Sequence, residues 1–486
     1  MDTTAVHKLP RLTKIIYGTG DWGMAAFNTL RQIFYAIFLT DVVGLDPRLA
    51  SLAATVGILW DAINDPLVGI LTDKMKSRWG RRRPFLLWFA VPYGLAFLAL
   101  WWAPPWNSQI LLMLHVMLAY ALSDTFQTLV IVPYLALTPE LTSDYDERTS
   151  LASYRMFFNF LASIGSAVAA PMVVDTVQAG GGTQQQGYMM AAVIFGISAV
   201  LPYLLIFLTV REKRPEEVHI EAVPVRRTFR QAWENIPFRY ATMLYMLNWV
   251  TFDLISVVLP FFLIYWVVGG DLLAKVPVFG MPIESVVLGL MMVTATVVLP
   301  LWWWASRHLG KRVAYLIAIG FWAILLIGVI FVPPQRYDLV VLLSVLIGVS
   351  VSAAHVLPDA IFPDVIDWGE LQTGVRYEGI YYGAKNFIRK LATASAMFVA
   401  LQVLGWLGYQ APPEGATQWT QPNSALLGMR ILIGPVSVLL LIAVMVVTWL
   451  YPLDRKQFER IQRLLERRRS RDARRREAPA AHTIPG

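Results

Sequence analysis

Long runs of mainly apolar residues, separated by short polar connections, recur along the whole chain. Each run is long enough to cross the roughly 30 Å hydrocarbon core of a bilayer as a helix, the form in which a single segment satisfies its own backbone in lipid. The pattern predicts twelve membrane-spanning helices, near residues 15–40, 49–72, 84–103, 109–137, 153–174, 188–210, 239–268, 283–304, 312–333, 338–362, 379–408 and 425–451.

A long polar segment divides these helices into two sets of six. We expect an N-terminal six-helix bundle at 1–210, a central cytoplasmic loop at 211–238, a C-terminal six-helix bundle at 239–452 and a basic cytoplasmic tail at 453–486. The polar start of the chain carries no cleavage signature, so we expect the first helix to stay in the mature protein.

Composition agrees with a polytopic membrane protein, because 56% of the 486 residues are hydrophobic, 15% are charged and the mean hydropathy is +0.53. The chain has no cysteine, which excludes disulfides and thiol chemistry. Its formal charge of +8 comes from short basic runs between the apolar segments, a distribution that argues against a nucleic-acid partner.

The basic residues also predict orientation. Lys and Arg lie mainly in every second connection, most densely at 73–83 and 211–238, whereas the alternate ones carry only Arg48, Lys275 and Arg336. Positive residues stay in the cytoplasm, so we expect both termini inside and a multi-pass protein of the plasma membrane, the inner membrane in a bacterium.

The two halves repeat short motifs. Gly69-x-x-x-Asp73 and Gly80-Arg81-Arg82-Arg83 follow the second predicted helix, and Arg307 to Arg312 is a weaker echo after the eighth. The first pattern resembles the signature of the major facilitator superfamily. Together with twelve helices it indicates an all-α polytopic membrane protein with two six-helix pseudo-repeats, the major facilitator fold, whose binding site lies between the repeats.

Nearly the whole chain also resembles the glycoside–pentoside–hexuronide:cation symporter family, which is melibiose-permease-like. The matching residues are Tyr17-Gly18-x-Gly20, Trp60-Asp61-Ala62-x-Asn64-Asp65-Pro66, Ser77-Arg78-Trp79-Gly80, Pro139-Glu140-Leu141-Thr142, Asp144-Tyr145-x-Glu147-Arg148, Tyr154-Arg155 and Arg376-x-Glu378-Gly379 leading to Lys390. The resemblance implies alternating-access symport of a sugar, glycoside or hexuronide with H⁺ or Na⁺.

Asp61 and Asp65 are the first candidate site. Four residues apart on a helix, they share one face, and ionised groups at membrane depth are costly without a partner or a function. Carboxylate oxygens suit Na⁺, while two close carboxylates also hold a proton well. The alternative is a structural ion pair with Arg31 or Arg155.

Asn64 adds an amide oxygen, and the resemblance implies that Thr128 of the fourth helix completes the cation site. The family often has a further carboxylate or amide where this chain has Ile131, and Asp124 lies seven residues earlier, too far to replace it. A site with fewer oxygens favours H⁺ over Na⁺, although both stay open. If the ion is Na⁺, Asp61 and Asp65 are its metal ligands, and no other cofactor is expected.

Three cations, Lys385, Arg389 and Lys390, lie in the eleventh predicted helix, where they need counter-charges or water. Lys390 matches the family's lysine at this place. A lysine that faces Asp61 or Asp65 would compete with the ion and couple its binding to conformation. Lys385 and Asn386 are candidates to bind sugar hydroxyls, and Arg389 is expected to snorkel toward an interface.

Further candidate substrate contacts are Asp21 with the stacking ring of Trp22, Tyr134, Arg155 and His355. Arg155 matches the family's sugar-contacting arginine, with a positive-inside anchor as the alternative. His355 shares a helix face with Asp359 and could relay protons, or simply pack with a hydrogen bond to a backbone carbonyl. Ala25 and Leu135 stand where melibiose-type members have a sugar-binding carboxylate and an aromatic ring, which argues against galactoside binding in their manner.

The basic tail places Phe458, Ile461, Leu464 and Leu465 at helical spacing, which predicts a cytoplasmic helix against anionic lipid. Two other functions stay open: a carrier of another amphipathic or anionic solute, such as a lysolipid or an organic acid, and a non-transporting sensor with the same fold. We expect no enzyme activity, because no catalytic, metal or phosphate-loop motif is present, and no obligate protein partner.

Overall fold

The computed structural model is almost entirely helical, and it describes residues 9–75, 77–142, 144–211, 233–374, 378–413, 415–453 and 455–477. Most of the expected central loop, the segment around Arg376 and the last residues of the tail lie outside this part of the chain. The N-terminal half contains α1 (Arg11–Gly18), α2 (Gly20–Ile37), the π-helical turn η1 (Phe38–Val42), α3 (Pro47–Lys74), α4 (Arg83–Leu100), α5 (Gln109–Leu141), α6 (Tyr145–Ala179) and α7 (Gln184–Thr209).

The C-terminal half repeats this series. It contains α9 (Ile236–Phe261), the π-helical turn η2 (Phe262–Val267), α10 (Ile283–Leu309), α11 (Lys311–Ile330), α12 (Tyr337–Thr373), α13 (Glu378–Trp406), α14 (Asn423–Ile431), the π-helical turn η3 (Leu432–Val436), α15 (Ser437–Leu450) and the tail helix α16 (Arg455–Glu477). A small antiparallel pair, β1 (Lys275–Val276) and β2 (Met281–Pro282), precedes α10.

Eleven of the twelve expected membrane segments are confirmed, and the first expected segment is helical as well. Eleven helical segments in the described part of the chain are long and apolar enough to cross a membrane. The remaining segment, α1–α2–η1, is interrupted at Thr19 and carries the polar residues Asp21, Asn28 and Arg31 within α2. Several helices also run past the apolar core: the 37 residues of α12 correspond to about 55 Å.

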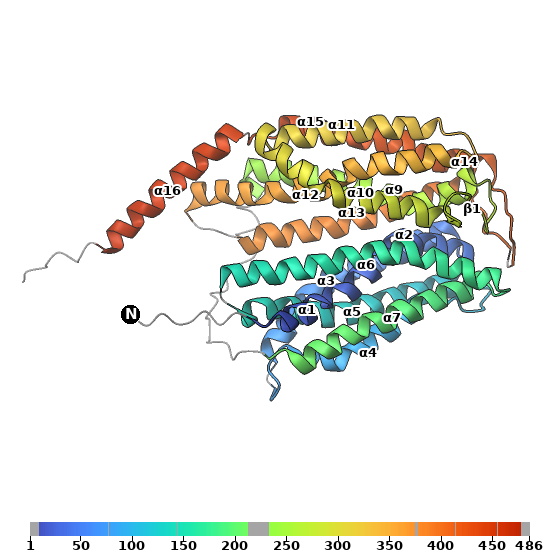
Figure 1. Cartoon of the computed structure of the whole chain (residues 1–486), viewed down its shortest axis with the longest axis horizontal. Coiled ribbons are helices and arrows are strands. Elements are labelled where there is room, and N and C mark those ends of the chain that lie inside the picture. The colour runs from blue at the N-terminus through green and yellow to red at the C-terminus, as the bar shows by residue number, and fades with distance from the viewer. Residues whose placement is uncertain are drawn as a thin grey trace, which may run out of the picture.

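The two halves lie against each other along their helices (Figure 1). Within the halves, α3 packs on α5 and α2 on α6, while α10 packs on α12 and α9 on α13. Between the halves, α3 contacts α13, α2 contacts α9 and α6 contacts α10. A side chain that faces inward from α2, α3, α9 or α13 therefore meets the other half.

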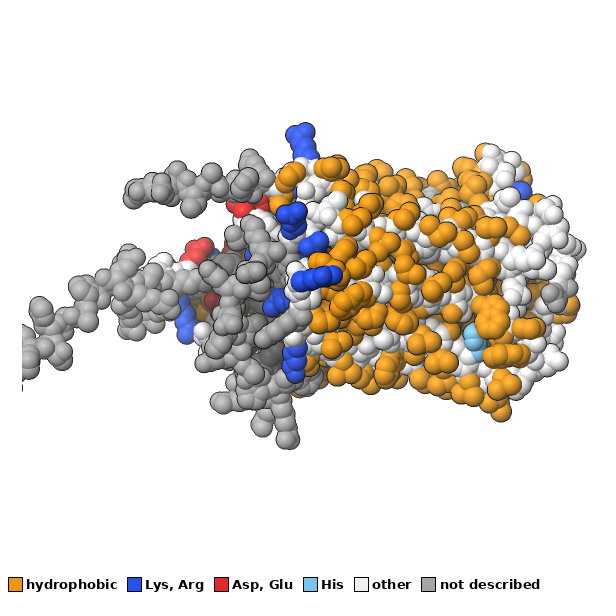
Figure 2. All heavy atoms as spheres, turned by 90° about the horizontal axis from the view of Figure 1, so that it is seen from below, with side chains coloured by type: hydrophobic (Ala, Val, Ile, Leu, Met, Phe, Trp, Pro, Cys, Tyr) orange, Lys and Arg blue, Asp and Glu red, His pale blue; other side chains and the backbone are white. Residues whose placement is uncertain are grey.

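The surface agrees with a protein embedded in lipid. Hydrophobic side chains form a broad belt, and Lys and Arg side chains gather along one edge of it (Figure 2). This edge, where α3 ends at Lys74 and α4 begins at Arg83, is called the basic end below. The first described helix, α1, and α16 lie toward the same end (Figure 1), which agrees with both lying on one side of the membrane.

The tail differs from expectation. Its apolar residues Ile461 and Leu465 are buried, and Gln462 Nε2 donates to Asp367 Oδ2 of α12 at 2.6 Å. Ile461 and Leu465 of α16 therefore pack on the protein itself, whereas Leu464 is exposed. The spacing of the apolar residues predicted the helix correctly, but not that part of its apolar side packs on the bundle.

Candidate cation and substrate site

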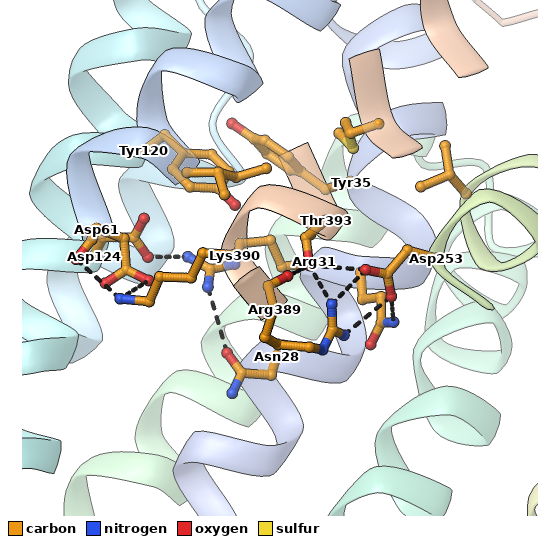
Figure 3. A pocket seen from close by; sticks show the side chains of 14 residues that line it. Asn28, Arg31, Tyr35, Asp61, Tyr120, Asp124, Asp253, Arg389, Lys390 and Thr393 are labelled. Atoms are coloured by element: carbon orange, nitrogen blue, oxygen red, sulfur yellow. Dashed lines mark hydrogen bonds and ion pairs between the residues drawn. The ribbon is translucent and has the colours of Figure 1, made fainter. Parts of the chain in front are cut away.

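A cavity of about 260 Å³ lies between the two halves, lined by α2, α3 and α5 on one side and α9 and α13 on the other (Figure 3). Most of its lining is polar or aromatic. The lining residues are Asn28, Arg31, Gln32, Tyr35, Ile58, Asp61, Tyr120, Asp124, Asp253, Val257, Arg389, Lys390, Thr393 and Met397. Charged groups at this depth are expensive unless they are paired or functional.

Lys390 of α13 reaches across the interface to both acids of α3. Its Nζ lies 3.0 Å from Asp61 Oδ2 and 2.5 Å from Asp65 Oδ2, and it donates to the Asp61 backbone oxygen at 2.9 Å. Thr128 of α5 donates through Oγ1 to Asp65 Oδ1 at 3.1 Å and contacts Asp61 Oδ1 at 3.5 Å. One cation from the C-terminal half is therefore held by two carboxylates of the N-terminal half.

Neither arginine named as an alternative partner binds these acids. Arg31 pairs with Asp124 of α5, and Arg155 pairs with Asp21. Asp124 is buried and lines the same cavity as Asp61, although its distance from Ile131 had argued against a place in the site. Arg31 also lies over the ring of Tyr120, 4.8 Å from its centroid.

Asn64 lies on the side of α3 that faces α5. It is buried, and its Nδ2 donates to the Asp124 backbone oxygen at 3.5 Å. This contact orients the asparagine next to the acid pair. The Asn64 amide thus lies beside the acid pair, but it does not line the cavity itself.

Arg389 does not snorkel toward an interface, which corrects the expectation for this residue. Its guanidinium binds the buried carboxylate of Asp253 on α9, with N–O distances of 2.5 Å and 3.0 Å. Thr393 donates to the same carboxylate at 2.8 Å, and Gln32 of α2 donates to it at 2.6 Å. The carboxylate thereby joins α9 and α13 to a helix of the opposite half.

Lys385 also has a counter-charge, since its Nζ lies 2.7 Å from Asp359 Oδ1 of α12 and near three aromatic rings. The neighbouring Asn386 is exposed. His355 is exposed as well, and its Nδ1 lies 3.0 Å from the Val351 backbone oxygen. That contact is the one expected of a packing histidine.

A separate cluster inside the N-terminal half contains Asp21, Tyr134 and Arg155, and Trp22 follows Asp21 in α2. Arg155 donates to Asp21 Oδ1 at 3.2 Å and 3.3 Å, and Tyr134 is fully buried with its hydroxyl 2.8 Å from the Tyr17 backbone oxygen. Trp22 Nε1 donates to Ser198 Oγ at 3.1 Å. None of these residues lines the cavity of Figure 3, so contact with a ligand there would require a rearrangement.

The halves are also joined away from the basic end. Asp41 of η1 accepts hydrogen bonds from the hydroxyls of Tyr265 in η2 and Tyr409. Gln402 of α13 donates to Ser51 Oγ of α3 at 2.9 Å. The ion pairs Lys14–Glu147 and Lys311–Asp364, near the basic end, each stay within one half.

This arrangement can exchange one cation for another. The described residues include no group of three or more His, Cys, Asp or Glu side chains that could hold a metal ion. Asp61, Asp65 and Thr128 nevertheless offer several oxygens at one place, now directed at an ammonium group. A proton or a Na⁺ ion could take the place of that ammonium.

Comparisons with known proteins match the chain to a family of transporters. The family model described as MFS/sugar transport protein matches residues 16–455. An uncharacterized symporter, sll1374, of Synechocystis is 28% identical over 96% of this chain and 98% of the relative. The putative glycoside/cation symporter YagG of Escherichia coli is 27% identical over 94% and 95%.

A second kind of relative is equally similar. The sodium-dependent lysophosphatidylcholine symporter 1-A of Danio rerio is 27% identical over 92% of this chain and 86% of its own length. Among solved structures, a D323A mutant of the nucleoside transporter NupG superposes with a TM-score of 0.63 at 12% identity, covering 90% of this chain and 100% of that one. At this identity the match shows the fold alone.

Proposed function

The chain belongs to the MFS/sugar transport protein family, and from that premise we propose that it is a secondary active transporter coupling the movement of a sugar or glycoside to that of H⁺ or Na⁺. Relatives named as symporters, one of them a putative glycoside/cation symporter, support the coupling. We place the protein in the plasma membrane, the inner membrane in a bacterium, with the basic end in the cytoplasm.

The observation that carries this proposal is the position of Lys390 between Asp61 and Asp65. The three groups come from both halves, and the lysine occupies the oxygens that a coupling ion would need. Ion and lysine therefore exclude each other. Since the lysine contact exists only where α3 and α13 meet, ion binding changes the stability of one conformation relative to another.

In this scheme the described conformation is the ion-free state, and it is open toward the cytoplasm. The hydrogen bonds that Tyr265 and Tyr409 donate to Asp41 support this assignment, because they join the two halves away from the basic end. Release of Lys390 by an incoming ion would loosen the contact between α3 and α13, and rocking of the halves would then expose the cavity to the other side.

Charge supports a neutral substrate. The three α13 cations each contact a carboxylate: Lys385 binds Asp359, Arg389 binds Asp253, and Lys390 binds both α3 acids. An anionic solute such as a hexuronate or organic acid would have to displace one of these acids. A polyhydroxyl solute can hydrogen-bond the paired groups without breaking them, and a cavity of about 260 Å³ suits one monosaccharide unit.

A lysophospholipid is the second candidate, favoured by the similarity to the lysophosphatidylcholine symporter. The zwitterionic head of lysophosphatidylcholine also has no net charge, so an Arg389–Asp253 pair could receive it. Its acyl chain, however, exceeds the space of the cavity and would have to leave between helices.

Uptake into membrane vesicles with imposed Na⁺ or pH gradients tests both candidates. We expect concentrative uptake of a neutral glycoside with one of the two gradients, competed by other neutral glycosides and not by uronates. Accumulation of lysophosphatidylcholine instead would establish the second candidate. Gradient-independent uptake, or no uptake of either class, would contradict symport.

A further inference from the structure

A second cavity, larger than the one between the halves, opens at the basic end of the C-terminal half. Its volume is about 730 Å³, and its walls come from the end of α10, the start of α11, α12, the end of α15 and the first turns of α16. It shares no lining residue with the cavity that contains Lys390. The transport mechanism gives it no function.

The walls carry a net positive charge. Arg307, Lys311 and Arg312 line the cavity together with the carboxylates of Asp364 and Glu459. Lys311 Nζ binds both oxygens of Asp364, at 2.8 Å and 2.7 Å. Arg312 donates to the Trp449 backbone oxygen, and its guanidinium carries further N–H donors. The charge balance favours an anion.

Tyr451 gives an independent indication of a ligand. Its side chain lines the cavity and is 3% exposed, yet its hydroxyl has no hydrogen-bond partner among the described residues. A buried hydroxyl without a partner is unfavourable and is rare in folded proteins. A phosphate oxygen beside Arg312 would satisfy it.

The position of this cavity relative to the membrane indicates that the phosphate belongs to a phospholipid. Trp449 lines this cavity, Trp303 and Trp304 lie within about one turn of Arg307 in α10, and all three are exposed. Tryptophans mark the level of lipid headgroups. Leu309 and Val313, which line the cavity, are also about half exposed. An apolar chain could therefore continue from the cavity along the membrane-facing surface.

We propose that this cavity binds the headgroup of an anionic phospholipid, with Arg312 and Tyr451 contacting its phosphate. Phe458, whose ring centroid lies 5.3 Å from Lys311 Nζ, lines the cavity from the side of α16. The lipid thus lies between the membrane-embedded bundle and the tail helix, and its binding stabilises the docked tail.

Thermal unfolding of the full chain in a neutral detergent, titrated with phosphatidylglycerol, tests the proposal. We expect saturable stabilisation by phosphatidylglycerol, and weaker effects of phosphatidylcholine and inorganic phosphate at equal concentration. Tyr451→Phe and Arg312→Gln should each weaken the apparent affinity about tenfold, since each removes a hydrogen bond to a charged group. Arg336→Gln, which changes an exposed arginine at the far end, serves as the control.

Tyr451→Phe separates binding from folding, because the lost hydroxyl has no hydrogen-bond partner in the part of the chain that the structure describes, and the lipid-free melting temperature should not fall. Equal stabilisation by phosphatidylcholine would overturn the proposal, because the site would then not distinguish an anionic headgroup from a zwitterionic one. Equal stabilisation by inorganic phosphate would assign the cavity to a soluble anion. Unchanged affinity in both variants would place the lipid elsewhere.

Discussion

Arg389 and Lys390 are consecutive residues of α13, yet their side chains bind carboxylates in opposite halves of the protein. Arg389 binds Asp253 of its own half, and Lys390 binds Asp61 and Asp65 of the other. Neighbouring positions on a helix point about 100° apart, so one turn of α13 serves two different contacts. One contact can break during transport while the other holds the helix in place.

The acid pair gives the first prediction. Asp61→Asn should abolish concentrative uptake, a loss of at least about tenfold, because an amide neither binds a proton nor balances Lys390. Accumulation of a glycoside in energised vesicles measures it. Asp338→Asn is the control, since that acid is exposed and pairs locally with Arg336. Undiminished accumulation in the Asp61 variant would remove this residue from the coupling mechanism.

Removal of the competing cation should have the opposite effect on ion binding. We expect Lys390→Gln to bind the coupling ion about tenfold more tightly, because the ion no longer displaces an ammonium group, while active uptake is lost. Ion-dependent protection against thermal unfolding gives the affinity. If the affinity stays the same, lysine and ion do not share the site.

The ion pair between Arg389 and Asp253 should contribute mainly to the stability of the folded protein. Arg389→Gln and Asp253→Asn each leave a buried charge unpaired, at a cost of about 3–5 kcal/mol. The double variant should cost clearly less than the sum, and a double-mutant cycle on thermal stability measures the coupling. The exposed pair Arg336 with Asp338 should show a coupling of about 0–1 kcal/mol. Additive costs at Arg389 and Asp253 would mean that the two residues act independently.

Tyr265 and Tyr409, which bind Asp41, should hold the two halves together at the end of the protein opposite the basic end. Tyr265→Phe with Tyr409→Phe removes two hydrogen bonds to one carboxylate and should favour opening by about 1–3 kcal/mol. Since the chain has no cysteine, Ser51→Cys reports this directly, because Ser51 is buried against Gln402 across the interface.

We expect faster alkylation of that cysteine, about tenfold or more, in the tyrosine variant. Ser437→Cys is the matched control, as it is equally buried but bonds within its own half. A similar increase at both cysteines would indicate general loosening of the fold instead of opening at one end.

Close packing of α3 on α5 gives a prediction on stability. A Cβ at Gly57 would overlap the Tyr120 ring, so Gly57→Ala should destabilise the protein by about 1–3 kcal/mol. Gly69→Ala on the same helix meets nothing within 4 Å and should stabilise it by about 0.5–1 kcal/mol. Thermal unfolding compares the two, and equal effects would contradict the packing.

Most of the fold could be predicted from the sequence because a bilayer leaves a long apolar run no choice but a helix. The acid pair and Lys390 could be linked because intramembrane charges need counter-charges and because Lys390 matches a lysine of the symporter family that the sequence resembles. Gln32 and Asp253 could not be placed, because nothing local indicates that α2 and α9 meet. For Arg389, its position beside Lys390 concealed that the two side chains point to different helices.

The docked tail has a practical consequence. Since α16 packs on α12 through Ile461, Leu465 and the bond from Gln462 to Asp367, it travels with the C-terminal half whenever the halves tilt. A fluorophore attached to the solvent-facing side of α16 and a second one on the loop before α4 would then act as a ruler. Their separation would follow each turnover in real time without any label inside the membrane.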